Sequence, residues 1–220
     1  MVVSHGTHRI LNTEPLGQAF ETGLGQNFMH FIFRPGTSPS LLLLHGTGGD
    51  ENDLIPLGEL LRPGAALLSP RGEILENGQR RFFRRFAPGV FDEVDLVRRA
   101  HGLADFVEDQ SARRRLGQVI AVGYSNGANI AASLLLLRPG LLAGAALFRA
   151  MVPFEPPHPP DLAGLPVLIL AGRHDEMIPT DHPQRLAALL LGAGADVTLD
   201  WRNSGHGLSE DEFILAREWI

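Results

Sequence analysis

Short, uninterrupted apolar runs recur along the chain, and each is followed by turn residues and then by a segment with helical spacing. Runs without polar alternation are typical of strands that a parallel sheet buries on both faces. The pattern predicts strands within residues 40–46, 65–72, 118–125, 144–152, 166–175 and 196–204. The stretch 27–36 alternates more, so we expect an edge strand there, and residues 1–26 leave room for one more strand.

The segments between these runs predict helices, because their apolar positions recur at helical spacing and stop signals follow them. Residues 50–64 and 91–115 begin with acids, and 209–220 opens with a Ser209/Glu212 capping box. The expected helices span 50–64, 91–115, 126–140, 182–195 and 209–220. Alternating strands and helices predict one α/β domain over residues 1–220, with a mostly parallel, doubly wound sheet and helices on both faces.

Composition narrows the choice of partner. The chain carries 19 basic and 25 acidic residues, a formal net charge of −6, which favours neither nucleic acid nor stable association with a membrane. The absence of cysteine excludes disulfides, thiolate metal sites and a cysteine nucleophile. Arg138, Pro139 and Gly140 interrupt the longest apolar stretch, and the N-terminus lacks a signal-peptide pattern, so we expect a cytoplasmic protein.

One pentapeptide raises the question of catalysis. Gly123-Tyr124-Ser125-Asn126-Gly127 follows an apolar run and precedes a helical one, where α/β-hydrolases place the nucleophile elbow G-x-S-x-G. The flanking glycines leave space where strand and helix pass closely, and the helix N-terminus favours developing negative charge. Taken alone, the pentapeptide is equally consistent with a small serine in a tight turn.

A serine nucleophile needs a base, and the base needs an acid that orients it. Asp175 and His206 each follow a predicted strand, in the order Ser, Asp, His of α/β-hydrolases. Singly, Asp175 is as readily a helix cap and His206 a solvated loop histidine, but three residues in this order at strand ends favour a triad. The less well placed rivals for the acid are Glu176, Asp181 and Asp200.

A glycine-rich turn, LLLLHGTGGDE, follows an early strand, where the second oxyanion donor of α/β-hydrolases lies. One preorganised donor to the tetrahedral oxyanion is worth roughly 3–4 kcal/mol. We assign the backbone N–H groups of Thr47 and Asn126 to this oxyanion hole, and we expect His45 to be structural. A phosphate-binding loop is the alternative, but Glu51 stands where its third glycine belongs.

Other residues are candidates for the substrate pocket. Residues on or near the loops that follow strands could form its walls, with ordinary core packing as the alternative: Leu54, Phe82, Met151, Met177 and Ile178. In RRFFRRF, residues 80–86, we expect a loop with phenylalanines packed inward and arginines reaching solvent. A basic and aromatic ligand strip is the alternative there. No His, Asp and Glu cluster has useful metal-ligand spacing, so we expect no metal site.

These residues together resemble the phospholipase/carboxylesterase family of α/β-hydrolases, particularly its bacterial carboxylesterases and hydroquinone-resistance hydrolases. The similarity runs from about residue 40 to the C-terminus. It includes the segments LLLLHGTGGDENDLIPLG, RFFRRFAPGVFDEVDL, GYSNGANIAASLLL, AGRHDEMIP and GHGLS. It implies an α/β-hydrolase fold without a large lid, no cofactor, and hydrolysis of small esters. The chain departs from the family pattern by a glycine inserted in HGTGGD and by Asn126, where glutamine is more usual.

The expected function is that of a serine carboxylesterase acting on short-chain carboxylic esters through Ser125, Asp175 and His206. Acyl-thioester hydrolysis and lysophospholipase activity are alternatives, and a non-catalytic sensor of a small ester or phenolic compound is the rival from another class. Dienelactone hydrolases share this architecture, but their usual cysteine nucleophile is absent. The expected partner is a small-molecule ester, and a homodimer is left open.

Overall fold

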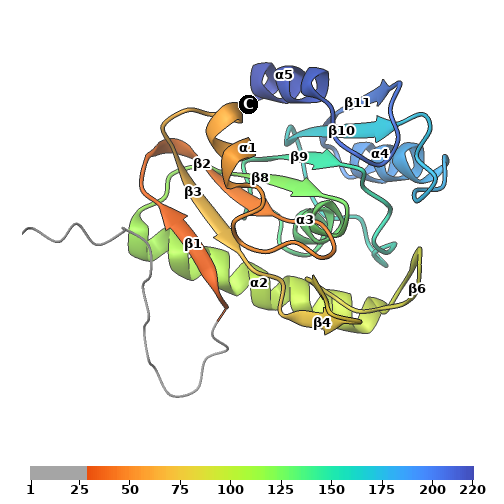
Figure 1. The fold of residues 1–220 in the computed structure, drawn as a ribbon, viewed down its shortest axis with the longest axis horizontal. Coiled ribbons are helices and arrows are strands. Elements are labelled where there is room, and N and C mark those ends of the chain that lie inside the picture. Colours follow the sequence, from red (N-terminus) through yellow and green to blue (C-terminus); the bar gives the residue numbers. More distant parts are fainter. Residues whose placement is uncertain (1–28) are drawn as a thin grey trace, which may run out of the picture.

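The computed structural model describes residues 29–220, which form a seven-stranded sheet between two layers of helices (Figure 1). The strand order is β1-β3-β2-β8-β9-β10-β11, with β1 antiparallel to β3 and the other neighbours parallel. Every strand predicted between residues 27 and 204 is present, whereas the strand suggested within residues 1–26 lies outside the described residues. The strands are β1 (Phe31–Arg34), β2 (Thr37–Leu44), β3 (Ala65–Pro70), β8 (Val119–Tyr124), β9 (Gly144–Phe148), β10 (Pro166–Gly172) and β11 (Asp196–Arg202).

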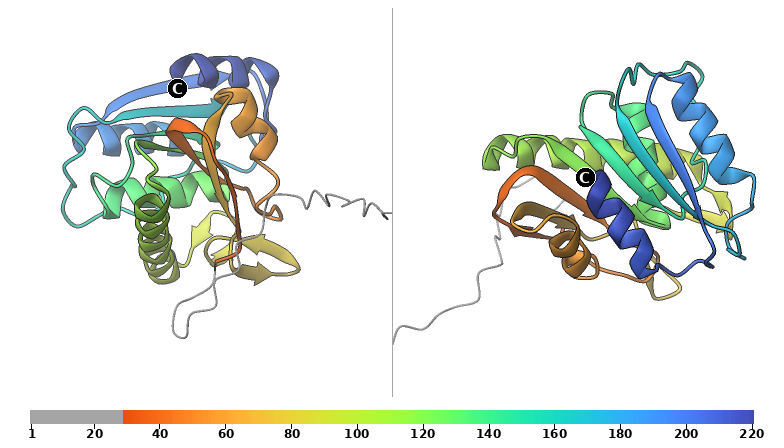
Figure 2. Two further views of the ribbon diagram at one scale, coloured as in Figure 1. Left: turned by 90° about the vertical axis from the view of Figure 1, so that its left-hand side faces the viewer. Right: turned by 90° about the horizontal axis from the view of Figure 1, so that it is seen from above.

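Helices cover both faces of the sheet, as predicted. Figure 2 shows α1 and α5 on one face and α2, α3 and α4 on the other, in agreement with the packing of their side chains. Asp92 caps α2 by accepting a hydrogen bond from the backbone N–H of Asp95 (3.0 Å), and α5 begins with the expected capping box. The helices are α1 (Ile55–Leu61), α2 (Glu93–Arg114), α3 (Asn126–Leu137), α4 (His182–Gly192) and α5 (Glu210–Trp219).

The apolar runs are continuous because alternate side chains of one strand enter two different cores. In β2, Leu41 and Leu43 pack with residues of α1 and α5, whereas Leu42 and Leu44 pack with residues of α2 and α3. All four side chains are fully buried. Complete burial of one leucine side chain stabilises the fold by roughly 1.5–3 kcal/mol, so this run places β2 inside the sheet and leaves its carboxyl end to carry a loop.

The first helix was predicted to begin too early. It begins at Ile55, because residues 51–54 form turns, and Asp50 accepts a hydrogen bond from the backbone N–H of Asn52 (2.8 Å). The acids expected in the first helical turn therefore precede the helix.

The expectation of a loop at residues 80–86 was also wrong, since this segment contributes to two hairpins. Strand β4 (Ile74–Glu76) pairs with β5 (Gln79–Arg81), and β6 (Arg85–Ala87) pairs with β7 (Val90–Phe91). Asn77 and Gly78 join β4 to β5 with φ values of 51° and 76°, as a two-residue hairpin turn requires.

In residues 80–86, not every phenylalanine is buried and not every arginine reaches solvent, contrary to expectation. Phe82 and Phe83 are buried, as predicted, but Phe86 is 76% exposed. Arg81 does not reach solvent: its side chain is 3% exposed and lies 3.6 Å from a carboxylate oxygen of Glu76. The first hairpin therefore carries a buried cation next to the loop that follows β2.

Candidate active site

Ser125 occupies the sharp turn between β8 and α3. Its backbone has φ 52° and ψ −112°, a strained conformation for a residue with a side chain, and its N–H donates to the Phe148 carbonyl (2.8 Å). A Cβ at Gly123 would lie 2.6 Å from the Gly127 carbonyl oxygen, and one at Gly127 would lie 1.9 Å from the Leu44 carbonyl oxygen. The glycines thus allow α3 to approach the sheet closely and hold Ser125 at its carboxyl edge.

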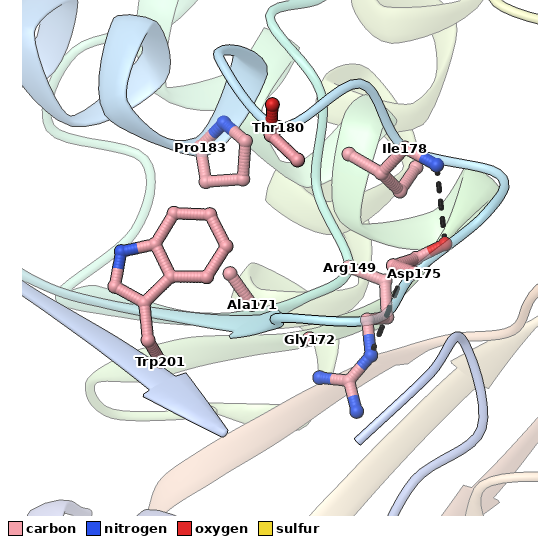
Figure 3. Close-up of a pocket in the computed structure, with 8 residues that line it drawn as sticks. All are labelled: Arg149, Ala171, Gly172, Asp175, Ile178, Thr180, Pro183 and Trp201. Carbon is pink, nitrogen blue, oxygen red and sulfur yellow. Dashed lines mark hydrogen bonds and ion pairs between the residues drawn. The ribbon is translucent and has the colours of Figure 1, made fainter. Parts of the chain in front are cut away.

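The three residues predicted to form the triad lie in one hydrogen-bonded chain. His206 Nε2 is 3.0 Å from Ser125 Oγ, and His206 Nδ1 is 2.8 Å from Asp175 Oδ2. The other carboxylate oxygen of Asp175 accepts from the backbone N–H groups of Met177 (2.8 Å) and Ile178 (3.1 Å), the second of which is drawn in Figure 3. These donors fix the carboxylate, which in turn orients the imidazole with Nε2 toward the serine.

The rival acids have other surroundings. Asp181 lies 3.4 Å from Arg185 of α4, and Asp200 lies 2.6 Å from Arg202 of β11. Glu176 is exposed on the loop after β10. Of the acids considered, Asp175 is the one that is hydrogen bonded to His206.

The predicted oxyanion donors follow two adjacent strands. Strand β2 pairs with β8 from Ser40 opposite Val119 to Leu44 opposite Gly123, which brings the loop of Thr47 beside the elbow. Asn126 is the first residue of α3, and the first N–H groups of a helix have no intrahelical partner. The Thr47 hydroxyl accepts from Arg81 Nη1 (2.6 Å), and the Gly48 N–H donates to the Arg80 carbonyl (2.9 Å). The first hairpin therefore anchors the loop that carries Thr47.

His45 supports the same loop from within the protein. Its Nε2 accepts a hydrogen bond from the Gly72 N–H (2.9 Å), so the proton lies on Nδ1, which donates to the Gly46 carbonyl (2.7 Å). Burial lowers the pKa of His45, which keeps the ring neutral and this tautomer in place. The ring also packs against Phe82, with centroids 4.7 Å apart. These contacts agree with the structural role expected from the sequence.

The five candidate pocket residues differ in how far they are buried. Leu54 and Phe82 are 7% and 3% exposed and belong to the two cores, which is the alternative considered for them. Met151 is buried after β9, and Ile178 lines a small pocket beside Asp175 (Figure 3). Met177 is 59% exposed, so it is the candidate most accessible to a substrate.

Sequence reasoning missed Arg149, which it placed inside a strand spanning 144–152. Strand β9 ends at Phe148, and Arg149 follows it with a positive φ of 58°. Its side chain is fully buried, and Nε lies 3.9 Å from Asp175 Oδ2 (Figure 3). One feature of the sequence could have identified Arg149. It is a single arginine directly after an apolar strand, at the sheet edge where Ser125, Asp175 and His206 were expected.

Two further observations concern residues 29–220. Within this part of the chain, no group of three or more His, Cys, Asp or Glu side chains is placed to hold a metal ion. No helix in it is long and apolar enough to cross a membrane.

A serine at a strained strand-to-helix turn, hydrogen bonded to a histidine and through it to an acid, defines this fold as an α/β-hydrolase. The sequence model of the dienelactone hydrolase family matches residues 86–215, and the chain belongs to that family. The turn between β8 and α3 holds Ser125, and the sequence contains no cysteine.

Individual relatives agree with this assignment. MhqD of Bacillus subtilis (strain 168), which is named as a hydrolase, is 48% identical over 194 residues, covering 87% of this chain and 97% of that protein. The crystal structure of the Bacillus cereus carboxylesterase matches with a TM-score of 0.82 and 45% identity, over 85% of this chain and 91% of that chain. A carboxylesterase from Mesorhizobium loti matches with a TM-score of 0.79 and 35% identity, over 84% and 89%. The chain is therefore a hydrolase of the dienelactone hydrolase and carboxylesterase type.

Proposed function

We propose that this hydrolase is a serine carboxylesterase that cleaves small, short-chain carboxylic esters through an acyl-enzyme on Ser125. The observation that carries the proposal is the chain of hydrogen bonds from Ser125 Oγ to His206 (3.0 Å) and from His206 to Asp175 (2.8 Å). Both distances are within hydrogen-bond range, and the first is short enough for His206 to accept a proton from Ser125.

In the acylation step, His206 Nε2 accepts the proton of Ser125 while Oγ attacks the ester carbonyl carbon. The electron pair of the carbonyl bond moves to the oxygen, and the backbone N–H groups of Thr47 and Asn126 stabilise the resulting oxyanion. When the tetrahedral intermediate collapses, the bond to the alkoxy group breaks and His206 donates its proton to the departing alcohol. Asp175 stabilises the imidazolium between these two transfers.

Deacylation repeats the sequence with water as the nucleophile. His206 accepts a proton from the water molecule, whose oxygen attacks the acyl carbon, and it then returns a proton to Ser125 Oγ as the carboxylic acid departs. Every proton taken up by the imidazole is released within the same half-reaction, so the enzyme is regenerated without a co-reactant.

The expected preference for short acyl chains is supported by the burial of three candidate pocket residues. Leu54, Phe82 and Met151 are buried among other side chains, so they offer little surface to a ligand. Each additional buried CH₂ contributes about 0.8 kcal/mol only where apolar surface receives it. A long chain would therefore gain little affinity beyond its first few carbons.

The test is a series of initial rates on p-nitrophenyl esters from acetate to laurate, with one acyl thioester and a Ser125→Ala control. We expect kcat/KM to depend on Ser125 and to fall with chain length. A faster reaction with the thioester would make the protein a thioesterase, and a rate that rises toward laurate would favour a lysophospholipase. No turnover of any ester by the folded protein would refute the proposal and favour a ligand sensor.

A further inference from the structure

A buried ion pair lies directly beneath the loop that carries His206. Arg149 follows β9 and Glu212 belongs to the first turn of α5, and neither side chain is exposed. The two terminal nitrogens of the guanidinium face the two carboxylate oxygens, with Nη2 2.9 Å from Oε2 and Nη1 hydrogen bonded to Oε1. This is the bidentate geometry that an arginine forms and a lysine does not.

The same guanidinium holds the His206 loop on both sides of the histidine. Arg149 Nε donates to the Gly205 carbonyl (2.9 Å), and Nη2 donates to the Gly207 carbonyl (2.7 Å) and lies 3.0 Å from the Ser204 hydroxyl oxygen. His206 has a glycine on each side, and glycine restricts the backbone less than any other residue. The rigid guanidinium of Arg149 therefore restrains the backbone of a loop whose two glycines leave it free to adopt many conformations.

Other contacts attach the loop at its margins. Glu212 Oε2 also accepts from the Ser209 N–H (2.8 Å), so the counter-ion of Arg149 fixes the point where the loop enters α5. Tyr124, the neighbour of Ser125, donates its hydroxyl to the His206 carbonyl (3.1 Å).

The cation also lies near the acid of the triad. Arg149 Nε is 3.9 Å from Asp175 Oδ2, the oxygen that is hydrogen bonded to His206 Nδ1 (Figure 3). A positive charge at this distance attracts the carboxylate. One side chain thus acts on both groups whose relative position determines where His206 Nε2 points.

We propose that Arg149, with Glu212 as its counter-ion, is a positioning residue that places the His206 imidazole between Asp175 and Ser125. It does so by binding the carbonyls of Gly205 and Gly207. The inference rests on the proposed triad and adds to it a support that no substrate touches. Burying two charges costs more desolvation free energy than burying apolar side chains of the same size, and the satisfied carbonyls of the loop explain why this pair is retained here.

The discriminating variant is Arg149→Lys. Lysine keeps the positive charge opposite Glu212, but a single nitrogen replaces three, so it cannot reach both glycine carbonyls and the carboxylate together. Arg138→Lys is the matched control, because Arg138 also pairs with two carboxylates, those of Asp105 and Glu108, and lies at the C-terminal end of α3.

For each protein we would measure the melting temperature, kcat and KM with p-nitrophenyl acetate, and the low-field NMR signal of the Nδ1 proton that His206 shares with Asp175. For Arg149→Lys we expect a folded protein whose kcat is about 10- to 100-fold lower, with KM nearly unchanged. Its NMR signal should be broadened or lost. Arg138→Lys should match the wild type in kcat, KM and the NMR signal.

A folded Arg149→Lys variant with wild-type kcat and a wild-type NMR signal would overturn the inference and leave the proposed function intact. If the wild type hydrolyses no ester, the proposed function fails, and the NMR signal still decides whether Arg149 positions His206. If Arg149→Lys does not fold, Arg149→Met combined with Glu212→Met removes both charges, a change that buried ion pairs often tolerate. That variant should show the same losses, and wild-type values in it would overturn the inference.

Discussion

Replacing Gly127 with alanine perturbs the close approach of α3 to the sheet. The added Cβ would lie 1.9 Å and 2.4 Å from the carbonyl oxygen and carbon of Leu44, and 2.6 Å from the carbonyl oxygen of His45. All three are backbone atoms, so no side-chain rotation relieves the overlap. Because Cβ atoms essentially never approach another heavy atom within 3.0 Å, helix and strand must separate by at least 1.1 Å (3.0 minus 1.9).

This displacement acts on the residues that the reaction needs. Gly127 lies two positions after Ser125 and one after Asn126, whose N–H is a proposed oxyanion donor. A misplacement of about 1 Å can reduce a rate by about 100-fold, and overpacking typically lowers the free energy of unfolding by about 1–3 kcal/mol. We expect Gly127→Ala to show both effects, with a smaller change in KM.

Gly102→Ala is the matched control, a second glycine-to-alanine change inside a helix. Gly102 is exposed in α2, and its added Cβ would meet no atom within 4 Å. Alanine is favoured over glycine in a helix interior by about 0.8–1 kcal/mol, so this variant should be more stable and fully active. Urea denaturation and initial rates measure both quantities. A Gly127→Ala variant with wild-type kcat and stability would refute the steric argument.

Three further outcomes follow from the site. Asp175→Asn should lower kcat by about 10⁴-fold. Asp181→Asn should leave kcat nearly unchanged, because this carboxylate is paired with Arg185. The reverse ranking in steady-state kinetics would identify a different acid. Burial lowers the pKa of His45 and of His182, so below pH about 6.5 the unfolded chain binds protons that the folded protein does not. The free energy of unfolding should therefore fall between pH 7.5 and 5.5, and a constant urea midpoint would contradict this. Treatment with EDTA should not change the initial rate, and a loss that a divalent metal restores would reveal a metal requirement.

The sheet could be predicted because each of its strands is long enough to show a pattern. Leu41 to Leu44 are four consecutive leucines that are fully buried, and such a run predicts a strand that is covered on both faces. The hairpins between β3 and α2 could not be found in the same way, since strands of two or three residues have no measurable periodicity. Their one local signal was Asn77-Gly78, whose positive φ values suit a tight hairpin turn.

The residues that we propose as the triad were chosen through topology, because parallel strands end at the same edge and the chain order of an α/β-hydrolase is known. Arg149 lay outside this reasoning. Its partners Gly205 and Glu212 are 56 and 63 residues further along the chain, and no local pattern connects them. Without the fold, an arginine after an apolar strand is indistinguishable from one that points into solvent.

The order of the strands explains why the support for the base comes from β9. Strands β9 and β10 lie between β8, which carries Ser125, and β11, which precedes His206. With neighbouring strands about 4.8 Å apart, the loop after β11 must span roughly 14 Å to bring the base to the nucleophile. A side chain at the end of β9 starts one strand spacing from β8 along that span, where an apolar residue would fill the volume but leave the carbonyls of Gly205 and Gly207 without the donors that Arg149 supplies. One guanidinium donates to both of these carbonyls and also pairs with Glu212, which no apolar side chain at the end of β9 could do.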